Sequence, residues 1–103
     1  DNELYIRLLN EEIEQKGVVQ LTVHGNSMFP ILKDGDLVTI EKGHQYNLGD
    51  VVAYFMVVDG KLKIIVHRIV LKRRDYLLTK GDNNDFIDNI KVKNTMVLGV
   101  ALL

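Results

Sequence analysis

The fold is decided by residues 51–71, which read VVAYFMVVDGKLKIIVHRIVL. The first eight residues are all apolar and rich in β-branched and aromatic side chains, a composition typical of a buried strand. Asp59 and Gly60 follow, and Asp-Gly is the strongest short-range signal for a β-hairpin. Residues 61–71 then place alternate side chains on opposite faces, with His67 among apolar neighbours. The stretch therefore predicts a long antiparallel hairpin.

Shorter strands are predicted on both sides of this hairpin. Turn-forming residues, mainly Gly, Asp and Asn, separate them. The expected strands are residues 18–24, 37–41, 76–80 and 95–103. Several short strands at close spacing indicate a mainly β domain, either a small, partly open β-barrel or a folded pair of sheets.

Residues 2–16 have the apolar spacing of one amphipathic helix, with Gly17 just past its end. We expect its apolar stripe to cover one side of the β core. The stripe consists of Leu4, Tyr5, Leu8, Leu9 and Ile13. We therefore divide a single domain into an N-terminal helix, residues 1–17, and a β core, residues 18–103.

Composition excludes several classes of function. Apolar residues make up 47% of the 103 residues and charged residues 26%, as in ordinary globular domains. A net charge of −1 argues against nucleic acid as a partner. The chain has no cysteine, which excludes disulfides, a thiolate nucleophile and a cysteine-type zinc site. We expect no metal and no cofactor.

The location of the protein depends on what lies outside the given chain. Its longest apolar run, Val51–Val58, is far shorter than the about 20 residues that span a bilayer. The chain begins at Asp1, and an initiator methionine is not usually removed from in front of aspartate. We therefore expect a piece of a longer protein, membrane-associated if an anchor belongs to it, and cytoplasmic if the chain is complete.

One serine is presented by its local sequence. Ser27 lies between Gly25, which allows a sharp turn, and Pro30, which keeps the preceding residue out of a helix. A serine hydroxyl needs a base before it can act as a nucleophile. His24 is too close in sequence and His44 falls in a loop, so His67 is the candidate base. The alternative is structural: Ser27 caps its turn and His67 binds a backbone carbonyl.

Five sequence boxes occur together and in a fixed order. They are Gly25-Asn26-Ser27-Met28-Phe29-Pro30, Gly35-Asp36, Gly49-Asp50-Val51-Val52, Val66-His67-Arg68-Ile69 and Thr79-Lys80-Gly81-Asp82-Asn83-Asn84. In order and spacing they closely resemble the type I signal peptidases, over residues 20 to 100. The resemblance is strongest to the branch of the endoplasmic reticulum, archaea and sporulation, which pairs serine with histidine. Self-cleaving SOS repressors share the catalytic fold and place a lysine where this chain has His67.

The resemblance implies a role for each residue of the site. Ser27 would attack the scissile carbonyl and His67 would accept its proton. Asp88, shortly after the Gly-Asp-Asn box, would orient the histidine, with Asp82 inside the box as the alternative. The substrate would be an extended peptide or preprotein with small residues before the cut, and no metal or cofactor would take part.

One departure from the family pattern concerns the oxyanion hole. Family members commonly carry a second serine two residues before the nucleophile, and here that position is Gly25. The hole would then consist of the Ser27 backbone amide and another donor, for which the Asn26 side chain is the candidate. A missing donor can cost about 10²- to 10³-fold in rate.

Further expectations concern substrate binding and rival functions. We expect Met28 and Phe29 to anchor the serine turn, and Val51–Val58 to offer a β edge to the substrate. The first rival is a self-cleaving regulatory domain, which lacks support because its usual lysine and cleavage pair are absent. The second is a non-catalytic β domain that only binds peptides.

Overall fold

The computed structural model describes residues 2–43 and 45–103; His44, one of the three histidines considered above, lies outside them. The elements are α1 (Asn2–Lys16), β1 (Val18–Thr22), β2 (Leu37–Glu41), β3 (Val51–Val58), β4 (Lys61–Lys72), β5 (Leu77–Lys80), the 3₁₀ helix η1 (Asn94–Met96) and β6 (Val97–Leu102). The predicted mainly β fold with one N-terminal helix is confirmed. The last strand begins two residues later than predicted, because residues 94–96 form η1 before it.

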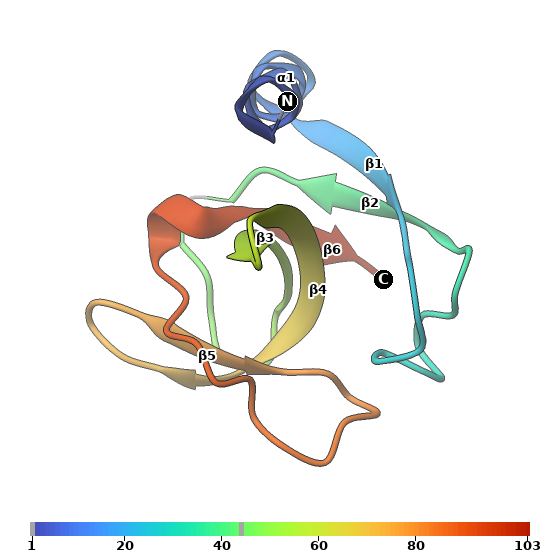
Figure 1. Ribbon diagram of the computed structural model, residues 1–103, viewed down its shortest axis with the longest axis vertical. Helices are drawn as coiled ribbons and strands as arrows, with labels where there is room; N and C mark the ends of the chain where they lie inside the picture. The colour runs from blue at the N-terminus through green and yellow to red at the C-terminus, as the bar shows by residue number, and fades with distance from the viewer. Residues whose placement is uncertain (1, 44) are drawn as a thin grey trace.

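The six strands form one curled antiparallel sheet. Their order is β1-β2-β6-β3-β4-β5, so β1 and β5 are its two edges. Figure 1 shows the sheet curling round on itself like an incomplete barrel, with β1 and β5 at the two sides of the gap. The two edges are not paired with each other, which confirms a partly open β fold.

The central hairpin forms as the sequence predicts. β3 pairs along its whole length with residues 61–68 of β4, and Val58 opposes Lys61 across a two-residue turn. Asp59 and Gly60 both have positive φ, 52° and 75°, as the turn that matches the twist of a hairpin requires. The expectation that β3 is an edge for the substrate is not met for residues 52–54, which pair with β6, and β3 lies between β6 and β4 in the strand order. Its apolar sequence reflects this central position.

Alternation along the strands gives the sheet an apolar cluster on each face. The larger cluster lies under α1 and includes Ile13, Val19, Leu21, Ile40 and Ala53. The second cluster consists of Tyr46, Val52, Tyr54, Ile69, Leu77 and Val92. Two buried polar side chains accompany the second cluster: Thr79, whose hydroxyl lies 3.1 Å from that of Tyr54, and His67, which is two residues from Ile69 on β4. Polar groups are thus buried on the same side as Tyr54.

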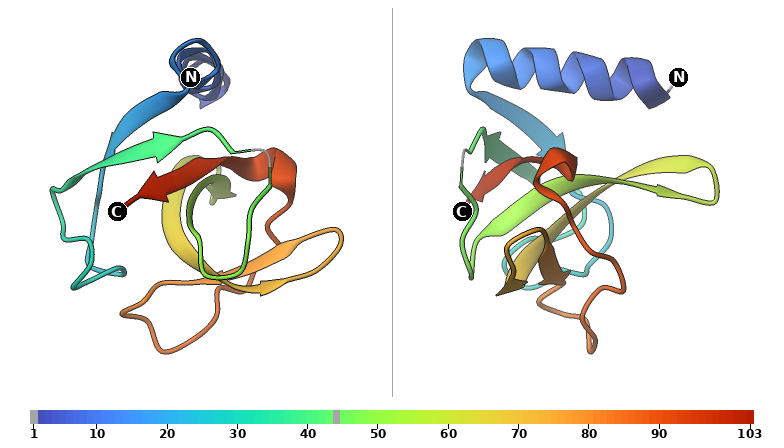
Figure 2. Two further views of the ribbon diagram at one scale, coloured as in Figure 1. Left: turned by 180° about the vertical axis from the view of Figure 1, so that it is seen from behind. Right: turned by 90° about the vertical axis from the view of Figure 1, so that its left-hand side faces the viewer.

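The helix α1 covers the sheet with only part of its apolar stripe. Leu9 and Ile13 are buried, whereas Leu4, Tyr5 and Leu8 are about half exposed. The right-hand view of Figure 2 shows why: the N-terminal half of α1 extends beyond β1. The prediction that the whole stripe covers the core is therefore correct only for its C-terminal part. Among residues 2–43 and 45–103, no helix combines the length and the apolarity needed to cross a bilayer.

Candidate active site

Two loops meet across the gap in the sheet. The first follows β1 and contains Ser27, and the second follows β5. The Asn83 amide donates to the Ser27 carbonyl at 2.8 Å, and the Asn83 side chain donates to the Asn26 carbonyl at 3.1 Å. The Asp82 amide lies 3.3 Å from the sulfur of Met28. These contacts hold the serine turn against the end of β5.

Glycine permits this close approach. A Cβ on Gly81 would lie 2.7 Å from the Ser27 carbonyl oxygen, well inside van der Waals contact, and 2.6 Å from the Asn84 side-chain nitrogen. The Ser27 carbonyl is backbone and is already held by Asn83, so it has little freedom to move away. Any larger residue at position 81 would push the two loops apart.

The serine turn is shaped by Gly25 and anchored by Met28. Gly25 has φ +82°, in the left-handed region that side chains other than glycine rarely adopt. Its amide donates to the Asp34 carboxylate at 2.7 Å. The positive φ at position 25 thus explains why the chain has glycine there and not the serine of the family pattern. Met28 is 2% exposed, as expected of an anchor, but Phe29 is 47% exposed, so the expectation that Phe29 anchors the turn is wrong.

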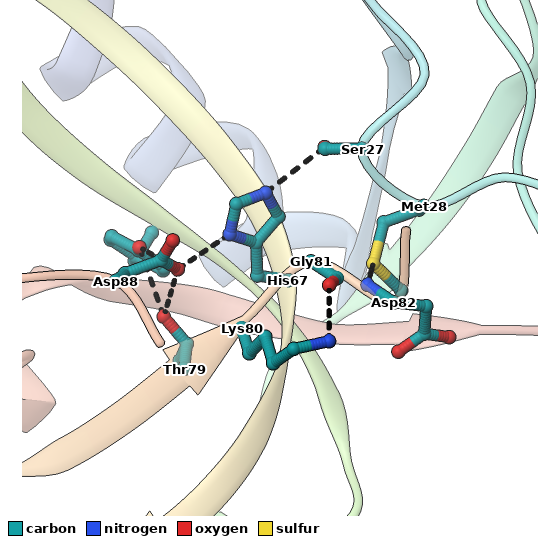
Figure 3. A network of polar contacts seen from close by, with 9 residues as sticks. Ser27, Met28, His67, Thr79, Lys80, Gly81, Asp82 and Asp88 are labelled. Carbon is teal, nitrogen blue, oxygen red and sulfur yellow. Dashed lines mark hydrogen bonds and ion pairs between the residues drawn. The ribbon is translucent and has the colours of Figure 1, made fainter. Parts of the chain in front are cut away.

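Ser27, His67 and Asp88 lie in one line of hydrogen-bond contacts. The distance from Ser27 Oγ to His67 Nε2 is 3.0 Å, and that from His67 Nδ1 to Asp88 Oδ2 is 2.5 Å. Figure 3 shows the imidazole between the two side chains, on β4. A carboxylate only accepts hydrogen bonds, so Nδ1 carries a proton and donates to Asp88. In the neutral imidazole, Nε2 then accepts the hydroxyl proton of Ser27.

Two residues to which the sequence assigned no role complete the surroundings of Asp88. Thr79 Oγ1 donates to Asp88 Oδ2 at 2.8 Å, and the Tyr54 hydroxyl lies 3.1 Å from Thr79 Oγ1 and 3.4 Å from Asp88 Oδ2. Burial, with the Asp88 carboxylate as a further cause, raises the pKa of Tyr54 to about 12. Tyr54 is therefore a neutral hydrogen-bond donor at physiological pH.

Asp82, the alternative acid, has a different partner. Its two carboxylate oxygens accept from Arg68 Nε and Nη2 at 2.9 and 2.8 Å. A further Arg68 nitrogen donates to the Gly49 carbonyl. The hydrogen bond from Arg68 lowers the pKa of Asp82, and the same bond raises the pKa of Arg68. The structure thus brings Asp88 to His67 and gives Asp82 to an ion pair.

The expected oxyanion donors lie on the serine turn. Among the contacts of the described residues, the Ser27 backbone amide makes no hydrogen bond. The Asn26 side chain is exposed, and its oxygen accepts from the Asp34 amide at 3.5 Å. Both groups therefore remain able to donate to a bound molecule.

A groove of about 770 Å³ leads to Ser27 and His67. One wall is formed by residues 20–24, in and just after the edge strand β1, and the other by residues 62–67 of β4. Asn2, Tyr5 and Leu9 of α1 also line it, and His24 belongs to its wall. Within the described ranges, no three His, Cys, Asp or Glu side chains gather closely enough to hold a metal ion.

The contacts of Ser27, His67 and Asp88 can be compared with those of known protein classes. The site has a serine, a histidine and a carboxylate in hydrogen-bond contact at the end of an open groove. Serine peptidases have the same arrangement. The chain belongs to the family described as peptidase S24-like, whose sequence model matches residues 1–102. The predicted kinship with the type I signal peptidases and their relatives is confirmed.

The chain is also similar to proteins of three fungi, each named signal peptidase complex catalytic subunit SEC11. Identity is 39% over 69 residues for the protein of Candida albicans (strain SC5314), 41% over 70 for that of Eremothecium gossypii, and 39% over 70 for that of Saccharomyces cerevisiae (strain YJM789). Each match covers 62% of this chain. The match spans about 40% of the length of each relative.

The ion pair of Asp82 predicts a pH dependence of stability. The pKa of Asp82 lies below its ordinary value of 3.8 in the folded protein, so the pair stabilises the fold above that value. This contribution is lost as pH falls through the folded pKa. The free energy of unfolding of wild type should therefore fall more steeply below about pH 4 than that of Asp82→Asn. Urea unfolding at a series of pH values measures both slopes. Asp85→Asn, an exposed carboxylate of the same loop, is the control and should keep the wild-type slope.

The contact of Gly81 with Ser27 predicts a steric effect. Gly81→Ala should lower the free energy of unfolding by about 1–3 kcal/mol, because the new methyl group overlaps the Ser27 carbonyl. Urea denaturation measures this loss. The double variant Gly81→Ala/Asn84→Ala removes the flexible neighbour but not the carbonyl, and should remain as unstable. Recovery of stability in the double variant would show that only the Asn84 side chain opposes the methyl group.

Proposed function

We propose that this chain is the catalytic part of a serine endopeptidase of the signal-peptidase type. The observation that carries the proposal is the pair of contacts made by His67, 3.0 Å to Ser27 Oγ and 2.5 Å to Asp88 Oδ2. A serine that only capped its own turn would not need a buried histidine 40 residues away in sequence. The histidine, in turn, binds a carboxylate and not a backbone carbonyl.

The reaction follows from this geometry. His67 Nε2 takes the proton of Ser27 as Oγ attacks the scissile carbonyl, and Asp88 stabilises the imidazolium that forms. His67 then returns the proton to the leaving amine, and the acyl group remains on Ser27. A water molecule, activated by the same imidazole, releases the acyl group and restores the hydroxyl.

The oxyanion that forms during attack needs hydrogen-bond donors. The Ser27 amide supplies one, because it has no other partner among the described contacts. The Asn26 side chain supplies the second, in place of the hydroxyl that Gly25 lacks. An exposed amide side chain is less fixed than a buried hydroxyl, so this donor is weaker than one built into the fold.

The substrate binds in the groove as an added strand. β1 is an edge of the sheet, and β5 pairs only with the C-terminal half of β4, residues 68–72. Residues 62–67 of β4 therefore face the groove without a strand partner on that side, among the described elements. An extended peptide that hydrogen-bonds to these free edges is held by its main chain, and pockets between the strands select its side chains.

The substrate class follows from the relatives. They are named catalytic subunits of a signal peptidase complex, and we propose the same kind of substrate for this chain: the leader segment of a preprotein with small residues before the cut. Because the match spans about 40% of the relatives' length, partner subunits belong to the proposal only by analogy.

The proposed nucleophile and base predict loss of activity on substitution. Wild type should cleave a leader peptide that carries small residues at the first and third positions before the cut. Ser27→Ala and His67→Ala should each lower kcat by about 10⁴-fold or more, because the residues act as one unit. Mass spectrometry of the peptide products measures cleavage. A fluorophosphonate probe should label wild type on Ser27 and leave Ser27→Ala unlabelled.

The same experiment separates the rival functions. Thermal unfolding serves as the control that both variants remain folded, and His24→Ala tests whether any groove histidine suffices. An internal cut of the chain itself, without peptide cleavage, would favour a self-cleaving domain. Peptide binding with neither cleavage nor a Ser27 adduct would favour a non-catalytic binding domain. Unchanged cleavage in both variants would refute the site.

The two aspartates predict opposite effects of matched substitutions. Asp88→Asn should lower kcat by about 10⁴-fold, because the amide cannot hold the same histidine tautomer. Asp82→Asn should leave kcat within about tenfold of wild type and cost about 1 kcal/mol of stability, as for a partly exposed ion pair. Peptide cleavage and urea unfolding, measured on both variants, decide which aspartate orients His67. The reverse pattern would assign the orienting role to Asp82.

A further inference from the structure

Near Asp88, at what we call the acid end of the site, lie two hydroxyl groups that the proposed mechanism does not use. Tyr54 lies on β3 and Thr79 on β5, on opposite sides of β4 in the sheet. They are 1% and 0% exposed. Both hydroxyls point at the carboxylate of Asp88, and Figure 3 shows Thr79 directly beside it.

Among the described residues, the hydrogen-bond contacts of the Asp88 carboxylate converge on one oxygen. Oδ2 accepts from His67 Nδ1 at 2.5 Å and from Thr79 Oγ1 at 2.8 Å, and Tyr54 lies at 3.4 Å. A hydroxyl has one proton to donate. Thr79 gives its proton to Asp88, so the Tyr54 proton goes to Thr79 Oγ1, at 3.1 Å, the shorter of its two contacts. The order of donation is Tyr54 to Thr79 to Asp88.

Thr79 also fixes the backbone of Asp88. The Asp88 amide donates to the Thr79 carbonyl at 2.8 Å. Asp88 lies in a loop without regular structure, and its side chain is 20% exposed. Without these contacts the carboxylate could rotate and exchange its histidine contact for water. One residue of a strand thus holds both the main chain and the side chain of the acid.

Burial makes the phenol of Tyr54 informative. The ring packs in the cluster with Val52, Ile69 and Leu77, where phenylalanine would fill almost the same space. A buried hydroxyl without partners costs free energy. The buried hydroxyl of Tyr54 is compensated by its hydrogen bonds at the acid end. The raised pKa of Tyr54 keeps this hydroxyl a donor.

We propose that Tyr54 and Thr79 are positioning residues, which form a relay of two hydroxyls that locks Asp88 in the orientation needed to hold His67. The inference rests on the proposed Ser27, His67 and Asp88 site. Neither residue touches the substrate. The relay should therefore affect the chemical step and leave binding in the groove unaltered.

Cleavage kinetics of the full chain test the relay. Thr79→Val, which has nearly the same shape, should lower kcat about 10- to 100-fold and leave KM unchanged, because a hydrogen bond to a charged group is lost. Thr79→Ser keeps the hydroxyl and should restore most of kcat. Tyr54→Phe should lower kcat by less than Thr79→Val. The double variant should match Thr79→Val, because Tyr54 acts through Thr79.

A spectroscopic readout separates this inference from the proposed function. The Nδ1 proton of His67, observed by NMR in protein labelled with ¹⁵N-histidine and assigned by its loss in Asp88→Asn, reports the His67 to Asp88 bond without any substrate. We expect a slowly exchanging downfield resonance in wild type and Thr79→Ser, and faster exchange in Thr79→Val and Tyr54→Phe.

The outcomes divide clearly. Wild-type kcat and an unchanged Nδ1 resonance in both Thr79→Val and Tyr54→Phe, at wild-type melting temperatures, would overturn the relay. A loss in the double variant equal to the product of the two single losses would overturn its order. If wild type neither cleaves the peptide nor reacts with the fluorophosphonate, the proposed function fails, and the Nδ1 resonance still decides the inference. Tyr54→Phe removes only one oxygen, so it provides the test even if Thr79→Val does not fold.

Discussion

The site depends on the hydrogen bond between the Asn83 amide and the Ser27 carbonyl. This bond joins the loop after β1 to the loop after β5, across the gap that the open sheet leaves. Among the described strands no pairing spans the gap, so this contact and the buried side chain of Met28 hold Ser27 near His67. Gly81 makes the contact sterically feasible, since it is the residue whose missing side chain leaves room for the Ser27 carbonyl.

Hydrogen bonds at the acid end of the site stabilise the largely buried carboxylate of Asp88. A carboxylate in a largely buried position is stable only when its oxygens are hydrogen-bonded. Asp88 Oδ2 has contacts with groups on three strands: it accepts from His67 on β4 and from Thr79 on β5, and the hydroxyl of Tyr54 on β3 lies 3.4 Å away. These are adjacent strands of the sheet, and the register of the sheet therefore fixes where the carboxylate lies. Asp88, although it lies in a loop, is therefore held in position by residues of the strands.

The sequence predicts the parts of the structure that are local. The Asp59-Gly60 hairpin, α1 and the alternation in β1 follow from turn residues and periodicity, and all three are observed. Ser27 and His67 were candidates for local reasons as well: a glycine-led turn presents one, and an apolar strand face holds the other. Their contact across the gap could be expected from the family resemblance, but not from periodicity.

Long-range features could not be predicted from the same signals. The central position of β3 follows from strand order, which one apolar run does not encode. Asp82 and Asp88 are both close to Gly81 in sequence, and the path of the loop determines which of them reaches His67. Asp82 forms an ion pair with Arg68, whereas the Asp88 amide donates to the Thr79 carbonyl. Tyr54 gave no signal, because a phenol within eight apolar residues resembles any other core aromatic. Only the fold shows that its hydroxyl reaches a charge.

The length of β5 explains why groove and site occur together. In the observed register Lys80 opposes Arg68, so one more paired residue would place Gly81 opposite His67, and continued pairing would cover residues 62–66 of β4. A longer β5 would fill the groove with the chain's own strand. It would also carry Asn83 away from Ser27 and break the contact that closes the gap. Because β5 ends at Lys80, Thr79 near its end contacts Asp88, and the loop after it turns toward Ser27. The same early end leaves the neighbouring edge of β4 open to an extended peptide.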